Sequence, residues 1–152
     1  MTIEEQTRED ANELLNAGVA YAKRMLRKYG QFGPFGYRLN EEGALVMEKI
    51  AQQEMPPDAA MLRNLLFDQL AEKIQRGHVS AAAMASNVSM AKPSEEGYSD
   101  AIMLEIEHRS GYAVKAFVPY RITGGQFFGF FPRVVRFGAI RTQDAAAQLF
   151  AR

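Results

Sequence analysis

Residues 100–121 read DAIMLEIEHR-SG-YAVKAFVPYR, the clearest structural signal in the chain. Two runs rich in β-branched and aromatic residues flank a Ser-Gly dipeptide, a pattern typical of a β-hairpin with a tight two-residue turn. Such a turn would place Arg109 opposite Tyr112 and would extend the register back to Asp100 opposite Arg121. The sequence therefore predicts a long antiparallel hairpin with this register.

Alternation of side chains gives the hairpin two faces in the predicted register. The face expected to lie in the core carries Ile102, Leu104, Ile106, His108, Ala113, Lys115 and Phe117. The face expected to be half exposed carries Met103, Glu105, Glu107, Arg109, Tyr112, Val114, Ala116, Val118 and Tyr120. The second face needs cover, because a sheet face turned to water is normally mostly polar. We expect a second copy of the chain to cover it in a two-fold homodimer. The alternative is cover by the N-terminal helix or the C-terminal tail of the same chain.

Two segments have the 3.6-residue period of amphipathic helices. The first covers residues 2–29, with acidic side chains in its first half and basic side chains at positions 23–28, which suits the helix dipole. These cations indicate either a patch for phosphate or an acidic partner, or a solvated helix end, and we favour the solvated end. The second helix opens at Pro56-Pro57-Asp58 and ends at Gly77.

Shorter patterns predict the remaining elements. We expect strands at residues 35–39 and 44–50, on either side of a polar loop. Residues 79–90 are rich in alanine, which favours helix, but the following strands need a neighbour, and we interpret the segment as a strand. The phenylalanine-rich residues 126–137 predict one or two more strands, and residues 143–151 a short C-terminal helix.

Together these elements predict a single α+β domain over residues 1–152. We expect an antiparallel sheet of five to six strands with the two main helices on one face, in the order α-β-β-α-β-β-β-(β). A chain of this length can bury a core without disulfides to support it.

Composition excludes several classes of protein. The 152 residues hold 18 basic and 18 acidic side chains, and this net charge of zero argues against a dedicated nucleic-acid binder. Cysteine is absent and there are only two histidines, so thiolate chemistry is excluded and a histidine-rich metal centre is not expected. The acidic start of the chain does not resemble a signal peptide, and no apolar run is long enough for a transmembrane helix. We expect a cytoplasmic protein without membrane, nucleic-acid or cofactor binding.

Polar side chains concentrate on the hairpin and are the candidate binding residues. They are Glu105, Glu107, His108, Arg109, Tyr112, Tyr120 and Arg121. Carboxylates two residues apart on one strand lie about 7 Å apart, a spacing that suits acid–base chemistry or a divalent metal. The same residues also make ordinary cross-strand pairs, which we favour. The predicted register puts the histidine on the opposite face from the glutamates, and no catalytic or metal-ligating residue is assigned.

The C-terminal phenylalanines are interleaved with Arg133 and Arg136, as in a surface on which nucleobases stack. A sheet core or a subunit contact accounts for the same composition. We favour a core or an interface between proteins.

Three motifs resemble those of a family of small bacterial α+β proteins of unknown function. They are FxPFG at residues 32–36, DAIxLxxEHRxGY at residues 100–112, and Pro119-Tyr120. The resemblance extends from the first helix to Phe137, and it implies kinship without an activity. The element order is also similar to that of roadblock-like and profilin-like domains, and this likeness implies a role in binding partners.

The sequence therefore favours a non-catalytic module that binds another protein or itself, as a bacterial immunity or accessory protein would. The alternative is a small enzyme or metal-dependent hydrolase that uses carboxylates of the 100–121 hairpin. A concave site where those carboxylates converge would indicate the enzyme.

Overall fold

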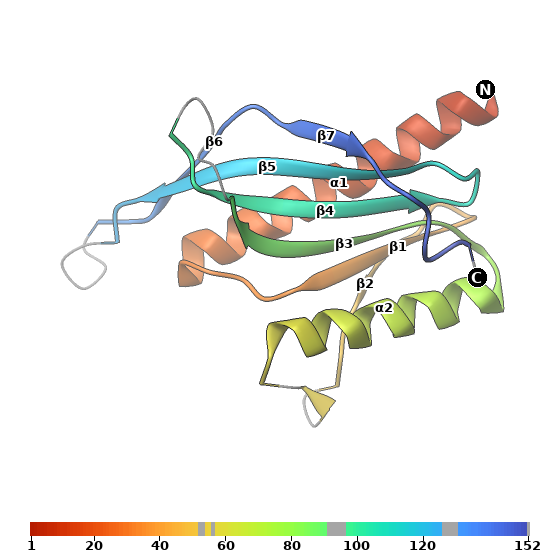
Figure 1. Cartoon of the computed structure of the whole chain (residues 1–152), viewed down its shortest axis with the longest axis horizontal. Helices are drawn as coiled ribbons and strands as arrows, with labels where there is room; N and C mark the ends of the chain where they lie inside the picture. Colours follow the sequence, from red (N-terminus) through yellow and green to blue (C-terminus); the bar gives the residue numbers. More distant parts are fainter. Residues whose placement is uncertain (52–53, 56, 91–96, 126–130, 152) are drawn as a thin grey trace.

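The computed structural model of the protein describes residues 1–51, 54–55, 57–90, 97–125 and 131–151 (Figure 1). The helices are α1 (Ile3–Tyr29) and α2 (Ala59–Arg76). The strands are β1 (Phe35–Asn40), β2 (Leu45–Glu48), β3 (Val79–Ser89), β4 (Asp100–His108), β5 (Ala113–Thr123), β6 (Val134–Phe137) and β7 (Arg141–Asp144). This architecture confirms the α+β class and the predicted order of helices and strands, including the strand interpretation of residues 79–90.

The strands form one antiparallel sheet in the order β2-β1-β3-β4-β5-β6. β7 also pairs with β5, which is long enough to hold β6 along residues 120–123 and β7 along residues 114–117. The sheet is therefore six strands wide, with the last position shared by two short strands.

Local signals set the ends of both helices. Thr2 and Glu5 form a capping box at the start of α1, and Gly30 ends the helix in the left-handed conformation, with φ of 77°. Asp58 accepts a hydrogen bond from the N–H of Ala60 at the start of α2. Gly77 follows the last turn of that helix. The helix predictions made from these residues are confirmed.

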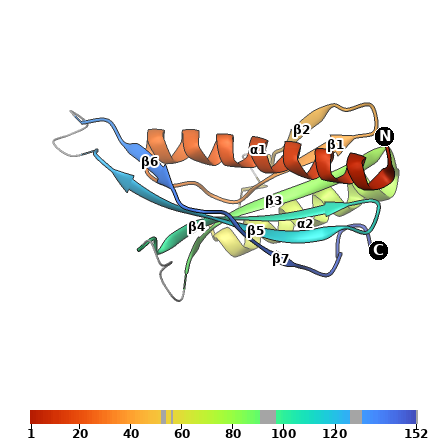
Figure 2. The same cartoon turned by 90° about the horizontal axis from the view of Figure 1, so that it is seen from above.

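The two helices pack on opposite faces of the sheet, and the prediction of one shared face is wrong. One core joins α1 to Ala81 and Ala83 of β3, whereas the other joins α2 to Ala82 and Met84 of the same strand. Figure 2 shows α1 running along one side of the sheet. Small alanines on both faces of β3 let a helix approach from each side. The alanine-rich segment therefore belongs to the sheet that forms the middle layer between α1 and α2.

The predicted register of the hairpin is also wrong, by one residue. Glu107 pairs with Ala113, not Arg109 with Tyr112. The N–H of Gly111 donates to the carbonyl oxygen of His108 at 3.0 Å. The N–H of His108 donates to the carbonyl oxygen of Tyr112 at 2.8 Å. The loop therefore has three residues, 109–111, one more than predicted. Gly111 closes it with a φ of 99°, a conformation that glycine adopts without strain.

The shift moves every side chain of β5 to the other face of the sheet. Val114, Val118 and Tyr120 are buried under α1, in one cluster with the isoleucines and leucine of β4. The half-exposed aromatic face that predicted a homodimer therefore does not exist. The N-terminal helix of the same chain covers these residues, which was the alternative explanation.

The predicted C-terminal helix over residues 143–151 is wrong as well. Residues 143–144 belong to β7, and residues 145–151 form no helix. The Oε1 atom of Glu107 accepts hydrogen bonds from the N–H groups of residues 148, 149 and 150, at 2.9, 2.9 and 3.3 Å. Leu149 is buried in the core under α2. A helix of this length is marginal on its own, and the segment instead gains the contacts with Glu107 and the burial of Leu149. Of the predicted strands over 126–137, β6 is observed, and residues 126–130 lie outside the described residues.

Candidate functional site

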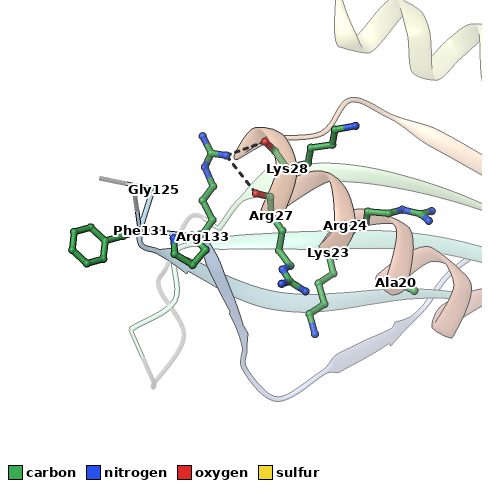
Figure 3. A pocket seen from close by; sticks show the side chains of 9 residues that line it. Ala20, Lys23, Arg24, Arg27, Lys28, Gly125, Phe131 and Arg133 are labelled. Atoms are coloured by element: carbon green, nitrogen blue, oxygen red, sulfur yellow. Dashed lines mark hydrogen bonds between the residues drawn. The ribbon is translucent and has the colours of Figure 1, made fainter. Parts of the chain in front are cut away.

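A wide cleft lies between the C-terminal half of α1 and the residues Gly125 and 131–133 (Figure 3). Its volume is about 940 Å³. The lining residues are Ala20, Lys23, Arg24, Arg27, Lys28, Gly125, Phe131, Pro132 and Arg133. Five of these carry a positive charge and none carries a negative charge. We call this feature the basic cleft.

The helical period brings four of the cations together. Lys23, Arg24, Arg27 and Lys28 occupy the last two turns of α1, on the side that faces water. Ala22 and Leu26, on the other side of the same turns, are fully buried against the sheet. Packing of the apolar side therefore orients the basic side toward the cleft.

Arg133 holds the opposite wall of the basic cleft against the helix end. Its guanidinium donates to the carbonyl oxygens of Lys28, at 2.9 Å, and Arg27, at 3.4 Å (Figure 3). These carbonyls belong to the last turn of α1, where intrahelical partners are lacking and negative charge accumulates. Arg133, which directly precedes β6, thus joins this wall of the cleft to the end of α1.

The four helix cations carry uncompensated charge. Among the residues that the structure describes, none of them takes part in an ion pair. Arg24 lies 5.4 Å from the ring centroid of Tyr21 and Lys28 lies 5.2 Å from that of Tyr29, contacts that leave the charge in place. The cleft can therefore hold an anionic ligand.

The two glutamates of the predicted site already have partners. Glu105 accepts three hydrogen bonds from the guanidinium of Arg63 on α2, two of them at 2.7 Å. Glu107 holds the C-terminal backbone. Both line a small cavity of about 130 Å³, but each carboxylate is engaged in a structural contact. The arrangement stabilises the packing of α2 and the C-terminal segment against the sheet.

The predicted site residues at the other end of the hairpin lie apart from the glutamates. The Tyr120 hydroxyl donates to Oδ1 of Asn87 at 2.6 Å. Burial raises the pKa of this phenol above its ordinary value, and the negative charge of Asp100 adds to the shift. Arg121 is exposed and stacks over the ring of Tyr98 at 5.0 Å. In the observed register Asp100 faces Tyr120, so the expected pairing of Asp100 with Arg121 is wrong.

The remaining predicted residues lie at the β4–β5 turn. Arg109 forms an exposed ion pair with Glu41, at 2.9 Å. His108 is buried and its Nε2 lies 2.9 Å from Oδ2 of Asp10, on α1. Tyr112 is 43% exposed and lines a separate cavity beside α1. The candidate binding residues are therefore spread over both faces and both ends of the hairpin, and do not form one site.

The four helix cations of the basic cleft are visible in the sequence, where we interpret them as a solvated helix end. The role of Arg133 was not predicted, because this residue lies more than a hundred residues from the carbonyls it binds. The signal was present in the run of four cations at spacings of one and three residues. The sequence does not show that residues 131–133 form a second wall opposite these cations, because only folding brings them to the end of α1.

Comparison of the chain with protein-family models, with curated proteins and with solved structures gave no match. The described residues contain no group of three or more histidine, aspartate or glutamate side chains placed to hold a metal ion. Within the same residues, neither helix combines the length and apolarity needed to cross a membrane.

Proposed function

We propose that the protein is a binding module whose basic cleft takes an acidic segment of a partner protein. The observation that carries the proposal is the presence of five cations, and of no acidic side chain, among the described residues that line one cleft. Oppositely charged surfaces steer partners together and favour the correct partner over others. This proposal keeps the expected cytoplasmic, protein-binding role and gives it a location.

The geometry favours an acidic protein segment over a nucleic acid. The positive charge is confined to the C-terminal half of α1, and the N-terminal half of the same helix exposes Glu4, Glu5, Glu9 and Glu13. A long polyanion that entered the cleft and followed α1 would meet this negative charge within about 15–20 Å, from the rise of 1.5 Å per residue. A short acidic segment avoids it.

The lining also supplies apolar contacts. Phe131, which is 53% exposed, and Pro132 lie on the wall opposite the four helix cations. Interfaces between proteins combine a desolvated aromatic side chain with a charged rim. We therefore expect the bound segment to carry acidic residues next to at least one large apolar side chain.

The proposal is tested with a fluorescein-labelled peptide of alternating glutamate and phenylalanine pairs, followed by fluorescence anisotropy. We expect binding that weakens as salt is raised, because salt screens the exposed charges of the cleft. Replacement of two cleft cations (Lys23→Gln with Arg27→Gln) is expected to weaken binding about 5- to 30-fold, from two lost charge contacts of about 0.5–1 kcal/mol each.

The matched control removes two cations from the last turn of the other helix (Lys73→Gln with Arg76→Gln) and should leave binding unchanged. Equal weakening in both double variants, or no binding of the peptide by the wild-type chain, contradicts the proposal. Tighter binding of a single-stranded oligonucleotide of equal charge contradicts the choice of a protein partner. Sedimentation velocity over a range of concentrations tests whether the partner is a second copy of the chain, which would give a species of twice the monomer mass.

A further inference from the structure

The first turns of α1 lie beside the β4–β5 turn (Figure 2). Polar side chains from both elements form a second cluster there. It consists of Thr7 and Asp10 from α1 and His108 and Ser110 from the turn. Asp10 and His108 are 7% and 3% exposed, whereas Ser110 is exposed. About 25 Å of helix separates this cluster from the basic cleft.

The hydrogen bonds of the cluster determine which ring nitrogen of His108 carries the proton. Nε2 lies 2.9 Å from Oδ2 of Asp10, and a carboxylate only accepts, so in the neutral ring Nε2 is the donor. The backbone N–H of Ser110 donates to Nδ1 at 3.0 Å, which requires a lone pair on that nitrogen. Asp10 is held in turn by Gln6, whose amide donates to Oδ1 at 2.7 Å.

The single lone pair of Nδ1 is shared between the backbone N–H and the hydroxyl of Ser110. The distance from Nδ1 to the Ser110 Oγ is 3.0 Å. The same hydroxyl lies 3.0 Å from Oγ1 of Thr7, which also reaches the carbonyl of Ile3 at 2.8 Å. A serine hydroxyl, a neutral imidazole that can take its proton, and a buried carboxylate behind the imidazole are thus in contact in that order. This is the arrangement by which an imidazole activates a serine nucleophile, and it is recognised from geometry whatever the order in the sequence.

The hydroxyl opens onto a cavity of about 440 Å³. The cavity is lined by Ile3, Glu4, Thr7, Arg8, Ala11, Asn12, Ser110 and Tyr112. Tyr112, Ile3 and Ala11 give it an apolar part, and Arg8 and Glu4 supply one positive and one negative charge. A cavity of this size suits a small molecule with an apolar body and a polar group.

We propose that Ser110 is the nucleophile of an acyl-transfer site that cleaves small carboxylic esters, with His108 as its general base. Asp10 is a positioning residue that holds the imidazole in the tautomer with Nδ1 unprotonated. The substrate class follows from the lining, with an apolar acyl or alkyl group against Tyr112 and Ile3 and the carbonyl oxygen or a carboxylate directed to Arg8.

The reaction proceeds in two steps, each balanced in atoms and protons. In the first, the Ser110 Oγ bonds to the ester carbonyl carbon while its proton passes to Nδ1 of His108. Collapse of the tetrahedral adduct breaks the bond to the alcohol oxygen, and His108 returns the proton to the departing alcohol. In the second, water attacks the acyl-serine, His108 accepts a proton from the water and delivers it to Oγ, and the carboxylic acid leaves.

A reagent that modifies activated serines tests the proposal directly on the wild-type chain. We expect incubation with a fluorophosphonate to add one phosphonyl group, detected by intact-protein mass spectrometry and assigned to Ser110 by peptide mapping. Ser110→Ala should abolish this modification and reduce hydrolysis of p-nitrophenyl acetate at least about a hundredfold toward the background of other side chains.

The controls separate activation from a purely structural role of the cluster. Ser89→Ala removes an exposed serine of β3 and should change neither reading. Asp10→Asn keeps the shape of the side chain and should slow the modification at least about tenfold, while far-UV circular dichroism shows an unchanged fold. No modification of Ser110 in the wild-type chain, or equal modification of Ser110 and Ser89, overturns the proposal and leaves the cluster as a structural link between α1 and the hairpin. The basic cleft plays no part in the fluorophosphonate modification or the ester hydrolysis, so the outcome of this test is independent of the proposed function.

Discussion

Val118 of β5 provides the sharpest test of the observed hairpin register. Its side chain is 2% exposed and lies in the core between β5 and α1. The register predicted from a two-residue turn would instead leave Val118 half exposed and place Lys115 in the core. Substitution of each residue by alanine therefore gives opposite results for the two registers.

The expected loss for Val118→Ala follows from the groups removed. Each buried methyl group contributes about 0.8 kcal/mol, so two account for about 1.6 kcal/mol. A residual cavity of roughly 30–40 Å³ adds about 0.7–1 kcal/mol at 24 cal/mol per Å³. We expect the free energy of unfolding to fall by about 2–3 kcal/mol, which lowers the melting temperature by roughly 4–12 °C for a chain of this size.

Urea unfolding followed by far-UV circular dichroism measures this change, since the chain has no tryptophan to report by fluorescence. Lys115→Ala is the matched control, because Lys115 lies on the same strand with its side chain on the other face and only partly buried. It should change the free energy by no more than about 0.5 kcal/mol. A smaller loss for Val118→Ala than for Lys115→Ala would refute the register and the burial of this face under α1.

Two further predictions concern the ends of the structure and its response to pH. Glu107→Gln removes the charge that holds the backbone of residues 148–150, and we expect faster proteolytic cleavage near Leu149 together with a loss of about 1–3 kcal/mol, measured by timed digestion and urea unfolding. The raised pKa of Tyr120 means that the unfolded chain loses this proton at lower pH than the folded chain does. The unfolded chain then binds fewer protons, so stability should decrease as pH rises above about 10, and Tyr120→Phe should reduce that decrease. An equal slope in both chains would contradict the assigned cause.

Local sequence signals were sufficient to predict the positions of most helices and strands, but not which face of each one is buried. Thr2, Asp58 and the glycines at 30 and 77 mark the helix ends because capping depends on neighbours within a few residues. The period of two in residues 100–121 likewise identified two strands. It did not reveal the register, because Ser110-Gly111 suits both a two-residue turn and the wider loop that is observed. One residue of difference reversed the burial of β5 and with it the expected dimer face.

The candidate sites show the same division. The four cations of α1 could be read from the chain, but the wall that makes them a cleft comes from Arg133, brought to the helix end by the return of the chain through β5 and β6. Likewise, the sequence places His108 and Ser110 at one turn, but the carboxylate of Asp10 reaches the imidazole only in the folded chain.

By itself the sequence determined the two main helices, the strands β1 to β5, the neutral charge and the absence of thiol chemistry, since each depends on composition or on contacts within a few residues. The tertiary structure alone decided which faces meet, because packing joins side chains whose separation in the chain carries no local signal. Asp10 and His108 are 98 residues apart and meet only when α1 lies across the hairpin. That contact, and the burial that accompanies it, belongs to the folded chain.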